Sequence, residues 1–574
     1  MFRWECSSPT VRLLDFRTSA FTLTGRFSIL ILLLLFPSAL VARERQITQE
    51  VNGTKFITIV CMATQYPEVC ISSLSAEPTA VKESRPKYLI KISIHVASKG
   101  VRESLDLANR LLKLSKTSSD VYAAASECSE TLNYSIDWLN TCNQSDLITR
   151  MDDIKSYLSA ALTYQNDCYS ALQEIQTTTF LSKMMAQIKS AASLISNSLS
   201  MLDALDSYGP DPTHWKPPHV HNHKKGPFVS SSASAQWIGK TDSELLEQPL
   251  YSLVPSVTVS TDGLANFTSI QAAVDSAPAN ATGNTRYIIY IKEGIYNETV
   301  RISSKKTLLM FMGDGINKTI ITGNRSVANQ PNMTTFDTAT VGISGAQFLA
   351  RDLTFENTAG PSGHQAVSLR VESDKAAFYR CSFLGYQDTL YAHVLRQFYR
   401  ECVIEGTIDF IFGNAAVVFQ NCDIRVRVGR VGVTLSTITA QGRTDPAQAT
   451  GFVLQNCTVN GTEDYIQAWQ ESPDSYRAFL GRPWKAYSTT IFMQTYMEAL
   501  IEPQGWLPWN GTFALSTLFY GEYNNSGPGS NCSSRVTWST QLNLTNVQPY
   551  SVQNFIQGST WLPLTNFSFT PSVS

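Results

Sequence analysis

Four short segments in the second half of the chain repeat one pattern: Phe378-Tyr379-Arg380-Cys381-Ser382-Phe383, Phe398-Tyr399-Arg400-Glu401-Cys402-Val403-Ile404, Val418-Phe419-Gln420-Asn421-Cys422-Asp423-Ile424 and Phe452-Val453-Leu454-Gln455-Asn456-Cys457-Thr458-Val459. The first three cysteines are 21 and then 20 residues apart. A period near 20 residues, rich in aromatic and β-branched side chains and without intervening helices, is typical of a parallel β-solenoid. The Leu-x-x-Leu-x-Leu frame of the competing leucine-rich repeats is absent. The repeats therefore predict a β-helix, which we expect to span residues 255–570.

The segment from 50 to 205 has helical periodicity instead. Apolar residues follow one another at steps of three and four, for example Ile188, Ala191, Ile195, Leu199, Leu202 and Leu205. Long amphipathic segments with short polar breaks predict an antiparallel four-helix bundle. Two cysteine pairs, Cys61 with Cys70 and Cys128 with Cys168, suit an all-α domain stapled by two disulfides.

Residues 206–250 differ in composition from both neighbours. They contain five prolines and a Ser-rich run, and they hold four of the seven histidines: His214, His219, His221 and His223. A metal site needs a packed scaffold, which this composition does not predict. We interpret the segment as a solvated linker.

The N-terminal region predicts entry into the secretory pathway. Phe27 to Ala42 is an uncharged, mostly apolar stretch of 16 residues after several arginines. That length is short of the roughly 20 residues that span a bilayer, and it is typical of a secretory signal. Leu40 fits poorly at a cleavage site after Ala42, so residues 1–42 are either a signal peptide or an uncleaved signal anchor. Only the uncleaved form would leave the protein attached to a membrane.

Composition agrees with a secreted protein. The chain carries 11 cysteines and 16 Asn-x-Ser/Thr sequons, a combination that favours disulfides and glycosylation. The net charge is −2 and only 16% of the residues are charged, so no basic surface for a nucleic acid is predicted.

Two acids recur at the solenoid period. Asp388 and Asp409 are 21 residues apart, and Gln365 and Gln387 are 22 apart. Residues one coil apart stack at about 4.8 Å, so the acids should be neighbours with a glutamine column beside them. Two close carboxylates cannot both ionise freely, and one pKa should rise. Such a pair suits an acid and a nucleophile.

The acid pair has an ordinary structural alternative, because Asp ladders are frequent in β-solenoids. Aromatic residues around both acids, such as Tyr391 and Phe412, favour a sugar-binding groove instead. A flat strand would point Gln387 and Asp388 to opposite faces, so the chain must bend there if both serve one site.

These residues lie in blocks that resemble plant pectin methylesterases over residues 255–570, and residues 50–205 resemble the inhibitor domain of that family. The matched blocks are Gly294-Ile295-Tyr296-Asn297-Glu298, Gln365-Ala366-Val367-Ser368-Leu369, Gly385-Tyr386-Gln387-Asp388-Thr389-Leu390-Tyr391, Gly406-Thr407-Ile408-Asp409-Phe410-Ile411-Phe412-Gly413 and Leu480-Gly481-Arg482-Pro483-Trp484. The resemblance implies a right-handed β-helix and hydrolysis of the C6 methyl esters of homogalacturonan.

The resemblance also implies roles for individual residues. Asp409 would be the nucleophile and Asp388 the proton donor and acceptor. Gln387, helped by Gln365, would stabilise the oxyanion, and Arg482 would pair with Asp409. The sugar chain would contact Trp484, Thr335 and Trp509. Neither a metal nor another cofactor is required.

Partners and location follow from the same resemblance. Pectin would be the substrate, inhibitor-type helical domains would bind in cis or in trans, and the plant cell wall would be the site of action. The Arg-Arg-Leu-Leu-type processing site of the family is not intact, since the corresponding residues are Lys240-Thr241-Asp242-Ser243-Glu244-Leu245-Leu246. Cleavage should then be slow, or occur near Lys224-Lys225 or before Leu245.

Three other functions compete with the esterase. A serine esterase lacks support, because no Gly-x-Ser-x-Gly elbow occurs. A retaining glycosidase would use two carboxylates at a similar spacing. A self-inhibited, pectin-binding wall protein would need inert acids. In that last case, or if the bundle only assists folding and secretion, the helical part would not regulate catalysis.

Overall fold

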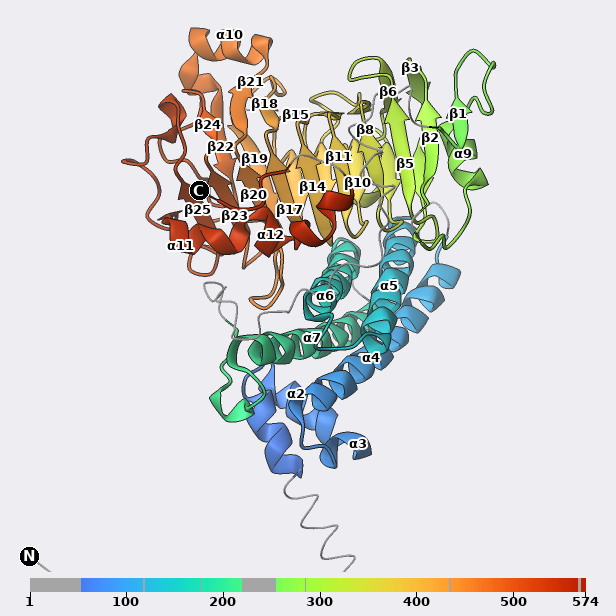
Figure 1. Cartoon of the computed structure of the whole chain (residues 1–574), viewed down its shortest axis with the longest axis vertical. Coiled ribbons are helices and arrows are strands. Elements are labelled where there is room, and N and C mark those ends of the chain that lie inside the picture. The colour runs from blue at the N-terminus through green and yellow to red at the C-terminus, as the bar shows by residue number, and fades with distance from the viewer. Residues whose placement is uncertain are drawn as a thin grey trace, which may run out of the picture.

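The computed structural model describes residues 53–116, 119–176, 178–218, 254–283, 285–432, 435–565 and 569–573. They form a helical domain and a larger β domain that pack side by side (Figure 1). The segment Phe27 to Ala42, the Lys224-Lys225 and Leu245-Leu246 sites and most of the linker lie outside the described residues. Within the described part of the chain, no helix is both long enough and apolar enough to cross a bilayer.

The helical domain is a four-helix bundle preceded by shorter helical segments. Its elements are a helical stretch at 53–61, α2 (Pro67–Ser75), α3 (Pro78–Val81), α4 (Pro86–Leu114), α5 (Asp120–Gln144), α6 (Met151–Gln173) and α7 (Thr179–Tyr208). Helices α4 and α6 both pack against α5 and α7, which closes the bundle. The hydroxyls of Ser119 and Thr178 cap α5 and α7 by accepting backbone N–H groups. Gly209, with φ of 81°, ends α7.

Two disulfides cross-link this bundle, as the cysteine spacing predicted. Cys61 pairs with Cys70 after the first helical stretch, and Cys128 on α5 pairs with Cys168 on α6. The second bridge ties together two helices that line the boundary with the β domain (Figure 1).

The β domain is a parallel β-helix, which confirms the predicted fold class. All strand pairs that connect its three sheets are parallel, and each sheet takes every third strand or nearly so. The first sheet contains β1 (Val257–Val259), β2 (Tyr287–Ile291), β5 (Leu309–Gly313), β8 (Leu349–Arg351), β11 (Ala376–Tyr379), β14 (Arg396–Arg400), β17 (Ala416–Gln420), β20 (Gly451–Gln455), β23 (Thr489–Met493), β25 (Phe519–Tyr523) and β26 (Thr540–Gln541).

The other two sheets complete each coil. The second contains β3 (Gly294–Asn297), β6 (Thr319–Gly323), β9 (Thr354–Asn357), β12 (Ser382–Leu384), β15 (Val403–Gly406), β18 (Asp423–Val426), β21 (Thr458–Gly461) and β24 (Tyr496–Met497). The third contains β4 (Val300–Ile302), β7 (Val341–Ile343), β10 (Leu369–Val371), β13 (Leu390–Ala392), β16 (Ile411–Gly413), β19 (Leu435–Gln441) and β22 (Arg477–Gly481). We call this last sheet the site sheet.

Short helices cover the parts of the β-helix that would otherwise expose apolar surface. These are α9 (Ile270–Ser276), α10 (Glu463–Glu471), α11 (Leu544–Val547) and α12 (Val552–Phe555). Val547 and Val552 belong to a buried cluster with Ala377, Phe398 and Val418, which face outward from the first sheet. The C-terminal segment therefore seals the outer side of that sheet.

The repeated motifs stack in register inside the coils. Phe378 pairs with Tyr399, which pairs with Phe419. The ring centroids of the first pair are 4.7 Å apart and those of the second pair 4.8 Å, with the rings stacked. Cys381 and Cys402 precede paired strands of the next sheet and are buried with them. The 20-residue period thus records one turn of the helix.

The bundle contacts the β-helix through α5, α6 and α7 (Figure 1). Thr163 on α6 accepts a hydrogen bond from the amide of Asn414 at 2.8 Å. Arg396 donates to Asp153 of α6 at 2.6 Å and to Asp374 of its own domain at 2.7 Å. These buried polar contacts give the two domains a defined relative position.

Phe378→Ala should destabilise the β domain, because Phe378 is fully buried within the aromatic stack. Removing such a ring costs about 3–5 kcal/mol through lost burial and the cavity left behind. Chemical denaturation should show this loss, and Ile295→Ala is the control because Ile295 is 67% exposed. Equal effects of the two substitutions would contradict the packing described here.

Candidate active site

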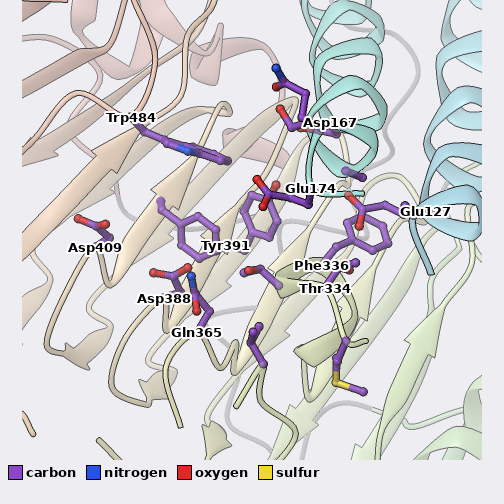
Figure 2. A pocket seen from close by; sticks show the side chains of 18 of the residues that line it. Glu127, Asp167, Glu174, Thr334, Phe336, Gln365, Asp388, Tyr391, Asp409 and Trp484 are labelled. Carbon is purple, nitrogen blue, oxygen red and sulfur yellow. The ribbon is translucent and has the colours of Figure 1, made fainter. Parts of the chain in front are cut away.

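A cavity of about 730 Å³ lies between the β-helix and the bundle. Its β-helical wall contains all eight residues that the sequence singled out: Thr335, Gln365, Gln387, Asp388, Asp409, Arg482, Trp484 and Trp509. Figure 2 shows Asp388, Asp409 and Trp484 around this space, with Tyr391 between them. Residues separated by up to 174 positions in the chain are thus brought to one site.

The two acids occupy equivalent places on neighbouring coils. Leu390 pairs with Ile411 between β13 and β16, so Asp388 and Asp409, each two residues earlier, are in register. Both lie in turns with left-handed backbone, at φ of 61° and 52°. Non-glycine residues adopt this conformation at a cost, and it is concentrated at functional sites.

The turn at Asp388 explains how adjacent residues serve one cavity. The chain bends between β12 and β13, so Gln387 and Asp388 are not on a flat strand and both line the space. The glutamine column is less regular than the sequence suggested. Pairing of Leu369 with Leu390 brings Ala366, and not Gln365, level with Gln387. Gln365 reaches the cavity from one residue earlier.

Asp409 is held by three groups. Arg482 binds it in a bidentate manner, with Nε 2.8 Å from Oδ1 and Nη2 2.7 Å from Oδ2. Thr437 donates its hydroxyl to Oδ1 at 2.6 Å and accepts the backbone N–H of Asp409 at 2.9 Å. Oδ1 therefore accepts two of these hydrogen bonds and Oδ2 accepts one. Charge-assisted bonds of this kind favour the ionised carboxylate.

Asp388 has the opposite environment. It is only 8% exposed, and burial together with the nearby charge of Asp409 raises its pKa well above the usual range, although Arg482 opposes the shift. Burial also lowers the pKa of Arg482, but its hydrogen bonds to Asp409 reverse that effect. One acid of the pair is thus favoured in its protonated form beside a carboxylate that is ion-paired.

Aromatic rings line the floor and rim of the cavity. Tyr391 stacks on Phe412 with ring centroids 4.2 Å apart, and Phe412 meets Trp484 edge-on at 6.1 Å. The guanidinium of Arg482 lies 4.5 Å from the ring centre of Trp509. Such flat apolar faces beside polar groups suit the rings of a sugar chain.

The sequence did not reveal two parts of the site. Thr437 lies one coil beyond Asp409, because Ile411 pairs with Thr439, but it is 28 residues away and so does not match the 20-residue period. The other part comes from the bundle, whose helices α5 and α6 supply Asp120, Glu127, Asp167, Ser170 and the adjoining Glu174 to the cavity wall. No local pattern marks these as site residues.

The described residues contain no group of three or more His, Cys, Asp or Glu side chains arranged to hold a metal ion. The polar groups that meet in the cavity are two carboxylates, two amides and a guanidinium. Together they can donate a proton, attack an electrophilic carbon and hydrogen-bond an oxyanion.

Comparison with known proteins agrees with this chemistry. The profile of the family described as pectinesterase matches residues 256–559, more than half of the chain. The chain belongs to the pectinesterase family. A second profile, described as plant invertase/pectin methylesterase inhibitor, matches residues 55–201, which form the bundle.

Individual relatives extend over both domains of this pectinesterase. It is 42% identical to a probable pectinesterase/pectinesterase inhibitor of Arabidopsis thaliana, across 89% of this chain and 85% of that protein. It is 39% identical to a pectinesterase of Citrus sinensis, across 89% and 87%. Among solved structures, the pectin methylesterase from carrot matches with a TM-score of 0.54 and 48% identity, covering 56% of this chain and 99% of the carrot chain.

Asp388→Asn should stabilise the protein at neutral pH. A carboxyl whose pKa is raised by folding contributes stability below its unfolded pKa, and this contribution is lost as the pH rises through the folded pKa. The amide carries no such dependence. The melting temperature of the variant, relative to wild type, should therefore rise by a few degrees between pH 4 and pH 7.

Thermal scans across that range test this expectation, with Asp474→Asn as the matched control because Asp474 is exposed. A difference between Asp388→Asn and wild type that stays constant with pH would contradict the burial effect.

Proposed function

We propose that this chain hydrolyses the C6 methyl esters of homogalacturonan, with Asp409 as the nucleophile and Asp388 as the proton donor and acceptor. The observation that carries the assignment is the contrast between the acids. Arg482 and Thr437 bind Asp409 as a carboxylate, whereas burial favours the protonated form of Asp388.

The first half of the reaction would release methanol. Oδ2 of Asp409, which accepts a single hydrogen bond from Arg482, attacks the ester carbonyl carbon and the carbonyl oxygen becomes an oxyanion. The side-chain amides of Gln387 and Gln365 would donate hydrogen bonds to that oxygen. As the tetrahedral species collapses, the bond to the methoxy oxygen breaks and the proton of Asp388 passes to it. Methanol leaves and an acyl-enzyme remains on Asp409.

The second half would restore the enzyme. Asp388, now ionised, takes a proton from water while the water oxygen attacks the acyl carbon. The bond to Asp409 breaks, which regenerates its carboxylate and frees the galacturonate. Asp388 is again protonated, so one ester and one water have become one acid and one methanol. No redox step or metal enters this balance.

The aromatic rim would position the polymer. Trp484 and Trp509, on the segment that follows β22 and the loop beyond it, offer flat faces on one side of the acids. Thr335 begins a short 3₁₀ turn, Thr335–Thr338, on the other side. A chain of sugar rings lying across the site sheet would contact both.

We also propose that the bundle inhibits the enzyme in cis. Side chains of α5 and α6 form one wall of the cavity that holds Asp388 and Asp409, so the polymer and the bundle cannot occupy the groove together. A tether of some 40 residues keeps the bundle at high effective concentration. An inhibitor-type domain of another chain could bind the same face in trans once this bundle has been removed.

The site of action that we propose is the plant cell wall, outside the cell. The two disulfides of the bundle support an oxidising compartment. Attachment to a membrane would apply only if the N-terminal signal is retained.

Asp409→Asn should abolish methylesterase activity, because an amide is a poor nucleophile and loses its ion pair with Arg482. Loss of a covalent nucleophile costs several orders of magnitude in turnover. Residues 255–574 are suitable for this assay, since the carrot chain corresponds to this part of the protein over 99% of its length and therefore shows that such a domain folds alone.

Methanol and new reducing ends should be measured together on methylated pectin. Methanol without reducing ends is expected from the wild type and from Asp423→Asn, a control whose carboxylate pairs with Arg425 on another sheet. New reducing ends would indicate a glycosidase instead. Activity of a folded Asp409→Asn protein above about a tenth of wild type would refute the nucleophile assignment.

The intact chain should be at least about tenfold less active than residues 255–574, because the bundle covers the groove. Asp153→Ala should partly restore activity in the intact chain, since it removes contacts across the interface to Arg396 and Lys375. Asp152→Ala, one residue earlier on α6, is its control. Equal specific activities of the intact chain and the β-helical part would show that the bundle assists only folding or secretion.

A further inference from the structure

The boundary between the domains contains a buried histidine that the ester hydrolysis does not use. His393 follows β13 and is 1% exposed. Its Nδ1 is 2.8 Å from Glu372 of its own domain, and its Nε2 is 2.8 Å from Asp167 of α6. Burial lowers the pKa of His393, but the charges and hydrogen bonds of Asp167 and Glu372 outweigh it and raise the pKa to about 9. The ring is therefore an imidazolium between two carboxylates at neutral pH.

The two carboxylates differ in what holds them. Glu372 is fixed within the β-helix, where Arg370 lies 3.5 Å away and the hydroxyl of Ser344 donates to it at 2.9 Å. Asp167 belongs to the bundle and lines the same cavity as Asp388 and Asp409. When the bundle departs, Glu372 still balances one side of the ring, and Nε2 loses its acceptor. A buried donor left unpaired is costly, so that position favours a new acceptor.

A second cation stands near Asp167. Lys485 lines the cavity three residues after Arg482, with its Nζ 5.2 Å from the ring centre of Trp484 and 3.4 Å from the hydroxyl oxygen of Ser170 on α6. Burial lowers the pKa of Lys485 and the negative charge of Asp167 opposes this. One carboxylate of the bundle thus interacts with two cations of the catalytic domain.

The aromatic surroundings connect this place to the groove. The ring of His393 lies 4.4 Å from that of Tyr391 and 6.0 Å from that of Phe336, centroid to centroid. Tyr391 and Phe336 themselves line the cavity. A sugar ring resting on these aromatic faces would carry its C6 carboxylate toward Nε2 of His393.

We propose that His393 and Lys485 form a subsite for a free galacturonate carboxylate, and that Asp167 fills this subsite in the intact chain. The proposal rests on the proposed pectinesterase function and adds a preference to it. The enzyme would favour an ester whose polymer already carries a free carboxylate at the neighbouring place. Each product carboxylate would then assist the next reaction, which leads to blocks of freed residues.

A purely structural role for His393 makes a different prediction. If the ring only joins Glu372 to the bundle, its replacement would change activity on all pectins by the same factor. A carboxylate subsite instead changes the ratio between substrates that have free carboxylates and those that have none.

The test uses residues 255–574 and two sets of homogalacturonan oligomers of equal length, one fully methylated and one about half de-esterified. Methanol release gives kcat/KM per ester for each. We expect the wild type to favour the half de-esterified set, and His393→Gln and Lys485→Met each to lower that ratio by about 3–10-fold, the effect of losing one charge-assisted bond. Lys318→Gln, which removes an exposed cation beside β6 on another sheet, should leave the ratio unchanged.

Binding supplies a second measurement that needs no turnover. Calorimetry with hexagalacturonate, which has no ester, should show about tenfold weaker binding to His393→Gln than to the wild-type domain. A ratio of substrates unaffected by both variants, or equal binding of hexagalacturonate, would overturn the subsite. If the wild type releases no methanol from either set, the proposed function fails, and the calorimetry alone then decides the subsite.

Discussion

The register between neighbouring coils is the constraint on which the rest of the structure depends. Backbone pairing such as that of Leu390 with Ile411 brings the turns that precede both strands to the same level. A slip of one residue would turn every side chain of a strand to its other face and separate Asp388 from Asp409. The stacked rings of Phe378 and Tyr399 inside the coils stabilise the same alignment. The catalytic geometry is thus a by-product of core packing.

Within that frame, the environment makes two identical side chains different. Asp409 receives a bidentate guanidinium and a hydroxyl, and Asp388 receives little besides burial and the charge of its neighbour. The division of labour that a covalent ester hydrolysis needs, one carboxylate and one carboxylic acid, follows from these contacts. Both acids sit in turns with positive φ, a backbone cost that the surrounding ladders hold in place.

Charge also explains how the bundle and the groove fit together. The β-helical side of the cavity presents Arg482 and Lys485, with His393 behind them, and helices α5 and α6 present carboxylates. A polymer of galacturonate has the same sign of charge as those helices. Burial raises the pKa of Glu127 on α5 to about 8, so not every acid on this face is charged at neutral pH. Complementarity therefore centres on Asp167 and its two cations.

The sequence by itself determined the β-helix, the bundle with its two disulfides, and the position of both acids. These depend on contacts between residues one coil or one helix turn apart, and such contacts leave a period in the chain. Thr437 escaped detection because the loop between β18 and β19 lengthens one coil and hides its register with Asp409. The irregular glutamine column escaped for a similar reason. Only the tertiary structure decided that Asp167 reaches His393, because two domains joined by a long linker dock through surface shape and charge, which no local spacing records.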